Sequence, residues 1–196
     1  PSTFFSKMTY GQTASNYQQN ILNCYNSLRE HQSEFVKQAP YSDLKVFEAI
    51  FNFIPKNSLL HISNSSAIRY AQLIDMPQDL EVFCNRGTSG IDGCTSTAIG
   101  AAVQTLKPTT LITGDISFLY DSNGLWNKYT PDNFKIIVLN NGGGGIFRIL
   151  PGHQDTEVFN TYFETEHQHT AEHLAKMYDY EYIKAEAEQS IPTKAK

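Results

Sequence analysis

The sequence predicts an α/β protein of three layers, in which helices cover both faces of a parallel sheet. Short apolar stretches that read as strands alternate with helical stretches, and this order is typical of parallel βαβ units. Residues 134–139 are strongly apolar, and residues 109–113, which follow Pro108, are also expected to form a buried strand. The chain has 196 residues, 40% hydrophobic and 18% charged, and this length and composition suffice for a substantial core.

The first part of the chain has weak patterning. Residues 17–37 carry a sparse apolar stripe, which indicates a mostly exposed helix or a linker. Asp43 is a candidate N-cap, because apolar residues follow it at near-helical spacing as far as Phe53. The sequence Pro55-Lys56-Asn57-Ser58 then predicts a turn before the first strand.

From residue 59 onward, strands and helices are expected to alternate. The expected strands are 59–63, 80–84, 109–113, 134–139 and, with less patterning, 180–183. The expected helices are 67–73, 94–104, 117–127 and 170–178, the last capped by Thr170. A glycine-rich turn at 86–90 and a loop at 140–145 connect two of these pairs.

Composition excludes several classes of partner. The net charge of −5 and the lack of any Lys/Arg run argue against nucleic acid. No apolar run reaches the length needed to insert into a membrane. Three cysteines without metal-ligand spacing fit a reducing compartment, so we expect a cytoplasmic protein.

Two polar segments lie where consecutive parallel strands end. Gly114-Asp115-Ile116-Ser117 follows one strand and opens a helix, and residues 140–145 (Asn-Asn-Gly-Gly-Gly-Gly) follow the next. Ligands bind at the carboxyl ends of such strands, so we expect the two segments to lie side by side. Asp115, the Asn141 amide and a loop carbonyl are oxygen ligands of the kind Mg²⁺ prefers. The helix start at Ile116-Ser117 offers free N–H groups to phosphate.

Either segment alone reads as an ordinary turn or a flexible loop. Their occurrence together, at two strand ends, favours a site for a magnesium-bound diphosphate.

The two segments resemble the GDG…NN motif of the thiamine-diphosphate enzymes, although Ile116 replaces the usual third-position glycine. A longer string resembles one family more closely, the SEPHCHC synthases of menaquinone biosynthesis, over roughly residues 41–185. The segments that carry this resemblance are Asn64-Ser65, Arg69, Asn85-Arg86-Gly87-Thr88-Ser89-Gly90-Ile91-Asp92-Gly93, Gly114-Asp115-Ile116-Ser117-Phe118-Leu119-Tyr120-Asp121, residues 140–147 and Leu150-Pro151. The 85–93 string is much the most specific of these. The resemblance implies the thiamine-diphosphate-binding fold.

The resemblance also implies a function and a set of site residues. The family decarboxylates 2-oxoglutarate on thiamine diphosphate and adds the succinyl carbanion equivalent to isochorismate. Mg²⁺ (or Mn²⁺) would be held by Asp115, Asn141 and the carbonyl of Gly143. The cofactor would contact Asn64, Ser89, Gly90, Ile91, Gly114, Asp115, Ile116, Ser117, Asn141, Gly143 and Gly144. Substrate would contact Ser65, Arg69, Arg86, Ile146, Phe147 and Leu150.

Some of these residues have plainer readings. Arg69 and Arg86 could form surface salt bridges, although a guanidinium fork suits the carboxylates of anionic substrates. Ile91 could be a core residue rather than the apolar wedge that bends the cofactor. The histidines at 167, 169 and 173 lack a complete ligand set and are interpreted as surface or structural side chains.

The family further implies that no catalytic acid/base lies in this chain. The activating glutamate belongs to an N-terminal domain of a partner subunit, in a homodimer or homotetramer. Residues 1–40 are then the linker or tail of a middle domain, and residues 41–196 are the diphosphate- and magnesium-binding domain, truncated at its C-terminus. The chain alone is expected to be inactive.

Other functions stay open at this point. One is another thiamine-diphosphate-dependent 2-oxoacid decarboxylase or synthase, and a second is a non-catalytic cofactor-binding module. A Rossmann dehydrogenase is disfavoured because no GxGxxG opens a first βαβ unit.

Overall fold

A computed structural model describes residues 15–152 and 156–186. The chain divides into two compact units, Pro1–Ala39 and Pro40–Lys196. The described part of the first unit contains one helix, α2 (Tyr17–Gln38), so the mostly exposed helix expected there is confirmed. Most of its apolar side chains are exposed, including Tyr17, Leu28 and Phe35. Its assignment to the tail of a preceding domain stays a prediction.

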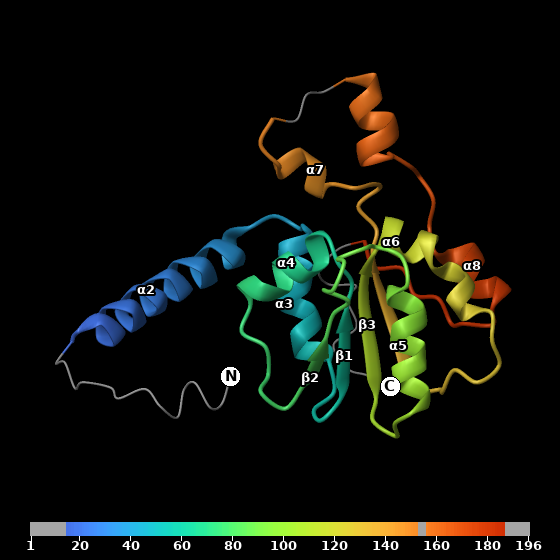
Figure 1. Ribbon diagram of the computed structural model, residues 1–196, viewed down its shortest axis with the longest axis horizontal. Coiled ribbons are helices and arrows are strands. Elements are labelled where there is room, and N and C mark those ends of the chain that lie inside the picture. Colours follow the sequence, from blue (N-terminus) through green and yellow to red (C-terminus); the bar gives the residue numbers. More distant parts are fainter. Residues whose placement is uncertain (1–14, 153–155, 187–196) are drawn as a thin grey trace, which may run out of the picture. The chain divides into compact units, whose positions relative to one another are not determined.

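The second unit is built on a parallel sheet of four strands in the order β2-β1-β3-β4 (Figure 1). The strands are β1 (Leu59–Ile62), β2 (Glu81–Phe83), β3 (Thr109–Gly114) and β4 (Phe134–Leu139). The two central strands are almost wholly buried, as strands covered on both faces must be. The predicted α/β fold with a parallel sheet is therefore confirmed.

Helices cover both faces of this sheet. On one face α3 (Asp43–Phe53) and α4 (Ser66–Leu73) pack on Leu60, Ile62 and Ile112. On the other, α5 (Cys94–Val103) and α6 (Asp115–Tyr120) pack on Leu111. Leu111 and Ile112 are neighbours in β3 and point to opposite faces, as strand geometry requires.

Two further elements complete the second face. The 3₁₀ helix η1 (Ser122–Leu125) contributes Leu125 to the core there, and α8 (Glu172–Met177) lies against the same core through Leu174. None of the described helices is long and apolar enough to cross a membrane.

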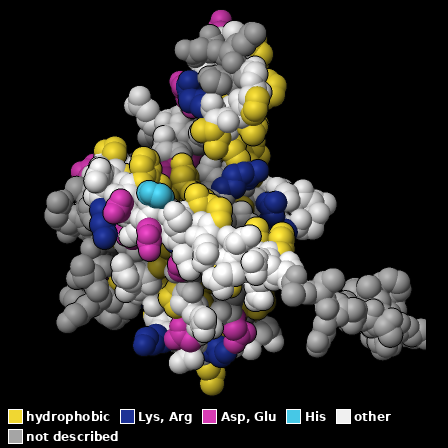
Figure 2. Space-filling view, turned by 90° about the vertical axis from the view of Figure 1, so that its left-hand side faces the viewer, with side chains coloured by type: hydrophobic (Ala, Val, Ile, Leu, Met, Phe, Trp, Pro, Cys, Tyr) yellow, Lys and Arg dark blue, Asp and Glu magenta, His cyan; other side chains and the backbone are white. Residues whose placement is uncertain are grey.

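A small lobe follows β4 and projects beyond the carboxyl ends of the strands (Figure 1). It contains α7 (Ile146–Ile149) and the π-helix η2 (Phe159–Glu164), neither of which the sequence patterning indicated. Arg148 ties the two together through ion pairs with Glu164 and Glu166. In Figure 2 the lobe is the upper part of the molecule, where apolar side chains gather on the surface.

Three helices differ from the sequence prediction in their N-caps or in their continuity. Helix α3 begins at Asp43, and its N-cap is Ser42 rather than Asp43. Helix α8 begins at Glu172 with Ala171 as its N-cap, not Thr170. The helix expected over 117–127 is two elements, α6 and η1. Asp121 is the C-cap of α6, and its carboxylate accepts from the N–H (2.7 Å) and hydroxyl (2.6 Å) of Ser96 near the start of α5.

The strand expected over 180–183 does not form. Asp179 is in the left-handed conformation (φ 62°) just after α8, and the Tyr180 N–H donates to the Ala175 carbonyl at 2.8 Å. This is the Schellman arrangement that terminates helices, with Asp179 in the place glycine usually takes. Tyr180 then packs on the core beside α8. The β-prone segment 180–183 therefore follows the C-terminal cap of α8 and forms no strand.

Candidate functional site

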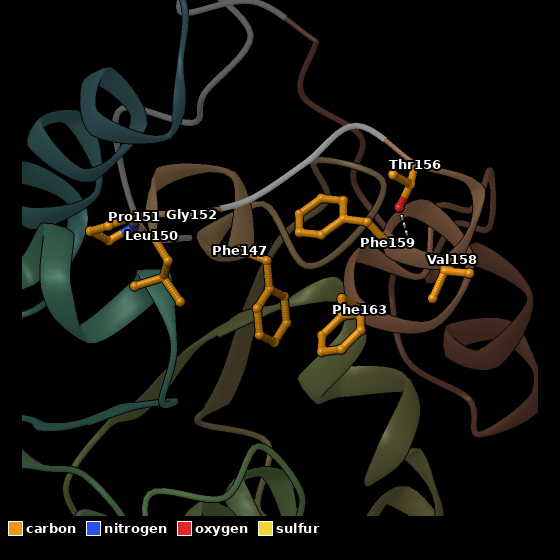
Figure 3. A pocket seen from close by; sticks show the side chains of 8 residues that line it. All are labelled: Phe147, Leu150, Pro151, Gly152, Thr156, Val158, Phe159 and Phe163. Atoms are coloured by element: carbon orange, nitrogen blue, oxygen red, sulfur yellow. Dashed lines mark hydrogen bonds between the residues drawn. The ribbon is translucent and has the colours of Figure 1, made fainter.

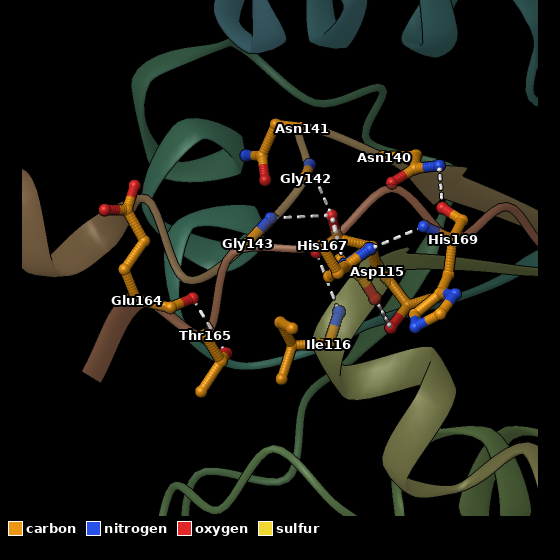
Figure 4. Close-up of polar contacts among 12 residues, drawn as sticks. Asp115, Ile116, Asn140, Asn141, Gly142, Gly143, Glu164, Thr165, His167 and His169 are labelled. Carbon is orange, nitrogen blue, oxygen red and sulfur yellow. Dashed lines mark hydrogen bonds and ion pairs between the residues drawn. The ribbon is translucent and has the colours of Figure 1, made fainter. Parts of the chain in front are cut away.

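The Asp115 side chain is the centre of the candidate site. Because β3 and β4 pair with Gly114 opposite Leu139, Asp115 lies directly beside the loop that follows β4. Its Oδ2 accepts from the N–H groups of Gly142 (2.7 Å) and Gly143 (3.1 Å), as Figure 4 shows. The residue is only 5% exposed. The predicted proximity of the two segments is confirmed.

The helix start beside Asp115 differs from the prediction. The Ile116 N–H was expected to be free for phosphate, but it donates to Oδ1 of Asp115 at 2.7 Å. Helix α6 is also only six residues long. The loop N–H groups and this helix start therefore hold the Asp115 carboxylate in one orientation.

Asn141 is oriented by Asp43, a residue that the sequence predicted only as a helix cap. Its Nδ2 donates to the Asp43 carboxylate at 2.8 Å, which leaves the Asn141 Oδ1 as the oxygen available to a metal. Burial raises the pKa of Asp43, the Asn141 hydrogen bond opposes this shift, and the charge of Asp115 adds to it. Two carboxylates thus repel each other beside the loop, and a divalent cation would relieve that repulsion.

Gly143 allows a very close approach of another segment. A Cβ built there would lie 2.9 Å from the Glu164 carbonyl oxygen, and the glycine has φ 156°. Its own carbonyl accepts from the Gly145 N–H at 3.0 Å. The carboxylate, amide and carbonyl oxygens gathered at Asp115, Asn141 and Gly143 match the hard oxygen ligands of Mg²⁺, so the donor set fits this metal.

Asn64 organises the turn between β2 and α5. The residue is 2% exposed. Its Nδ2 donates to the carbonyls of Asn85 (2.7 Å) and Gly90 (2.6 Å), and its Oδ1 accepts from the Arg86 guanidinium at 2.9 Å. The side chain predicted to contact the cofactor therefore holds the 85–93 turn in shape.

The same turn is bound to the Asp115 segment. The Ser117 hydroxyl donates to the Ile91 carbonyl, and the Ser89 hydroxyl donates to the Arg86 carbonyl at 3.3 Å. Ile91 is half-buried and belongs to neither core cluster, so it is not an ordinary core residue. The segment predicted to hold the diphosphate and the turn predicted to contact the cofactor through Ser89, Gly90 and Ile91 are thus linked.

Ser65 has an unusual backbone conformation, φ 71° and ψ −135°, between β1 and α4. Such conformations cost about 1–3 kcal/mol for a non-glycine residue and cluster at functional sites. The Ser65 carbonyl accepts from the Arg69 guanidinium at 2.9 Å. Arg69 and Arg86 are both exposed, and within the described ranges neither forms a salt bridge. Their positive charge is therefore available to an anion.

The lobe contains a cavity of about 350 Å³ that opens among aromatic side chains (Figure 3). Phe147 and Leu150, both predicted to wall the substrate pocket, line it. Ile146 does not line it and is buried instead. The remaining lining residues are Pro151, Gly152, Thr156, Val158, Phe159 and Phe163.

One of the three histidines interpreted as surface or structural side chains has a buried side chain at the site. His169 and His173 are exposed, as interpreted, but the side chain of His167 is 8% exposed and its Nε2 lies 3.3 Å from Oδ2 of Asp115. The residue lies far from Asp115 in the sequence, and no spacing pattern pointed to it. Among the residues described, no three His, Cys, Asp or Glu side chains form a metal-binding cluster of their own.

Comparisons with known proteins identify relatives of this chain. A 2-succinyl-5-enolpyruvyl-6-hydroxy-3-cyclohexene-1-carboxylate synthase of Flavobacterium johnsoniae is 62% identical over 177 residues, which cover 90% of this chain and 32% of the relative. The synthase of the same name from Flavobacterium psychrophilum is 57% identical over 198 residues, covering 100% of this chain and 36% of the relative. The synthase of the same name from Porphyromonas gingivalis is 42% identical over 160 residues, which cover 81% of this chain and 28% of the relative.

The chain spans about a third of the length of these curated relatives. A family model also matches, the thiamine pyrophosphate enzyme C-terminal TPP binding domain, over residues 65–196. That range includes Asp115, the loop after β4 and the strained Ser65. The chain therefore belongs to the thiamine pyrophosphate enzymes and carries their C-terminal TPP-binding domain.

Proposed function

We propose that this chain is the diphosphate- and magnesium-binding part of a transferase that decarboxylates 2-oxoglutarate and adds the succinyl unit to isochorismate in menaquinone biosynthesis. The proposal rests chiefly on the buried Asp115 carboxylate beside Asn141, with two exposed arginines on neighbouring turns. The relatives are 2-succinyl-5-enolpyruvyl-6-hydroxy-3-cyclohexene-1-carboxylate synthases, and their name supports this choice of product.

In this proposal the residues around β3 and β4 anchor the cofactor. Asp115, Asn141 and the Gly143 carbonyl hold Mg²⁺, which neutralises the diphosphate. Ile91 and its neighbours Ser89 and Gly90 form the turn that supports the rest of the cofactor. Bound thiamine diphosphate supplies the electron sink for decarboxylation, and the protein binds it, orients it and excludes water.

The substrate side is formed by Ser65, Arg69 and Arg86. Both substrates are anionic, and each guanidinium can bind a carboxylate through two charge-assisted hydrogen bonds. Two exposed arginines favour dianionic substrates over small neutral ones. Phe147 and Leu150 add an apolar wall through the cavity of the lobe.

The proposal places the activating glutamate outside this chain, in a partner subunit of a cytoplasmic homodimer or homotetramer. The 196-residue chain is therefore expected to show no turnover by itself. Turnover by the isolated chain would show that the glutamate is misplaced.

The deciding assay uses the protein expressed from its complete reading frame with 2-oxoglutarate, thiamine diphosphate and Mg²⁺. Carbon dioxide release is expected, and isochorismate should convert the succinyl unit into the coupled product. An Asp115→Asn variant is the matched control and should release almost none. Absence of carbon dioxide from the wild-type protein would sink the proposal, and release without coupling would identify a decarboxylase with another acceptor.

A further inference from the structure

A short strap, residues 164–169, runs along the glycine loop that follows β4. The Gly144 N–H donates to the Glu164 carbonyl at 2.6 Å, and the His167 N–H donates to the Gly142 carbonyl at 3.0 Å. A Cβ on Gly142 would lie 3.2 Å from the His167 carbonyl oxygen. The loop can approach the strap this closely because glycines form it, so the strap is part of the Asp115 site.

The strap places the His167 ring against Asp115 (Figure 4). The His167 and Asp115 side chains are 8% and 6% exposed, with Nε2 3.3 Å from Oδ2. The His167 Nδ1 accepts from the His169 N–H at 3.0 Å, so the ring proton of a neutral imidazole resides on Nε2. Nε2 is buried and has no hydrogen-bond partner among the described residues, although Oδ2 of Asp115 lies only 3.3 Å away. Its N–H therefore faces one acceptor, the Asp115 carboxylate.

The two oxygens of Asp115 differ in how many donors they face. Oδ2 accepts from two loop N–H groups and faces Nε2 of His167, whereas Oδ1 accepts from the Ile116 N–H alone among the described residues. A carboxylate oxygen accepts about two hydrogen bonds. Oδ2 is therefore saturated on the protein side, and Oδ1 keeps capacity for a metal.

We propose that His167 is a positioning residue of the metal site, whose Nε2–H fixes the Asp115 carboxylate so that one oxygen is directed to the divalent cation bound with thiamine diphosphate. This inference rests on the proposed function. Side chains that hydrogen-bond a metal ligand fix its orientation, and their loss typically weakens metal affinity about 10–100-fold. His167 touches neither metal nor substrate and acts through Asp115.

A purely structural role for His167 would come from its ring, which stacks on His169 with centroids 5.4 Å apart. Two substitutions separate the ring from the donor. His167→Phe keeps an aromatic ring and removes Nε2–H, whereas His167→Gln removes the ring and keeps an amide N–H of similar reach. Both remove the Nδ1 acceptor, so that loss cancels in the comparison. His173→Phe, at an exposed position on α8, is the matched control.

The experiment measures Mn²⁺ affinity in the presence of thiamine diphosphate, by electron paramagnetic resonance of free Mn²⁺, with the protein expressed from its complete reading frame. His167→Phe is expected to raise the Kd for Mn²⁺ about 10-fold or more, and His167→Gln less than about 3-fold. His173→Phe should match the wild type. The KM for thiamine diphosphate should rise in parallel, with kcat at saturating cofactor within about twofold.

Three results would overturn the inference. If His167→Phe binds Mn²⁺ with the wild-type Kd, the Nε2–H donor is not needed for metal binding. Equal weakening in the Phe and Gln variants assigns the effect to packing. A wild-type protein that retains Mn²⁺ no better than Asp115→Asn contradicts the proposed function itself, which distinguishes the two failures. Unfolding midpoints of each variant in metal-free buffer identify any variant that binds poorly because it is unfolded.

Discussion

The cofactor-anchoring region and the substrate-facing region are built in opposite ways. The Asp115 carboxylate is buried and already paired, with two loop N–H groups on one oxygen and the Ile116 N–H on the other. Around Arg69 and Arg86 the charged groups are exposed, and within the described residues each guanidinium donates one hydrogen bond to a nearby oxygen. The first region is preorganised within this chain, and the second presents its charge outward.

The difference follows from what each region binds. A diphosphate with its metal is small and highly charged, so a rigid set of oxygens and N–H groups recognises it best. Organic substrates with carboxylates at both ends need a wider surface, such as Arg69, Arg86 and the cavity of the lobe together. Substitutions should therefore disturb stability and metal binding in the first region, but substrate affinity in the second.

The largest effect is expected for Asp115→Asn. The amide keeps only one acceptor oxygen, so either the two loop N–H groups on Oδ2 or the Ile116 N–H on Oδ1 lose their buried acceptor, at about 1–3 kcal/mol of unfolding free energy. Loss of the charged ligand should weaken Mn²⁺ binding by more than about 100-fold, beyond the effect of an outer hydrogen-bond partner. Urea unfolding and Mn²⁺ titration measure the two losses. An unaltered Kd would remove Asp115 from the metal site.

A pair of glycine substitutions tests how tightly the anchor is packed. In Gly143→Ala the new methyl meets the Glu164 carbonyl oxygen at 2.9 Å, so the strap must move. We expect a loss of about 1–3 kcal/mol in stability and weaker retention of thiamine diphosphate. Gly100→Ala, on an exposed position of α5 with no atom near its Cβ, should instead stabilise by about 0.5–1 kcal/mol. Equal melting temperatures for the two variants would contradict the close packing.

The anchor was also the more predictable region. Parallel strands end at one edge of a sheet, so the proximity of Asp115 to the loop after β4 followed from the strand pattern. The contacts of Asp43 with Asn141 and of His167 with Asp115 did not follow from that pattern, because each joins elements that are distant in sequence. The missing strand at 180–183 has a local cause. Asp179 takes a left-handed conformation, which aspartate tolerates but which an aspartate in the sequence does not predict.

In the substrate-facing region, Arg69→Ala should leave stability within about 0.5 kcal/mol, since the side chain is exposed. Loss of a charge-assisted contact to a substrate carboxylate costs about 1.5–3 kcal/mol, which is roughly a 10–100-fold rise in the KM for 2-oxoglutarate. Mn²⁺ affinity should be unaffected. Arg69→Lys keeps the charge but not the planar guanidinium, so its KM for 2-oxoglutarate should lie between those of the wild type and Arg69→Ala. A change in Mn²⁺ affinity comparable to that of Asp115→Asn would erase the contrast between the regions.

The smallest effect concerns His61, a buried residue of β1 that stacks on Phe83 and belongs to neither region. Burial lowers its pKa below the ordinary value of 6.5, and its Nε2 has no hydrogen-bond partner in the described structure. Below pH 6.5 the unfolded chain binds a proton at this residue while the folded chain does not. Stability should therefore fall as the pH falls from 6.5 toward the lowered pKa, by at most about 1.4 kcal/mol per pH unit. His61→Leu cannot bind that proton, and the other histidines contribute equally to both proteins. Urea unfolding of the two at pH 7.5, 6.5 and 5.5 should show a steeper loss in the wild type, and parallel curves would mean that His61 titrates alike folded and unfolded.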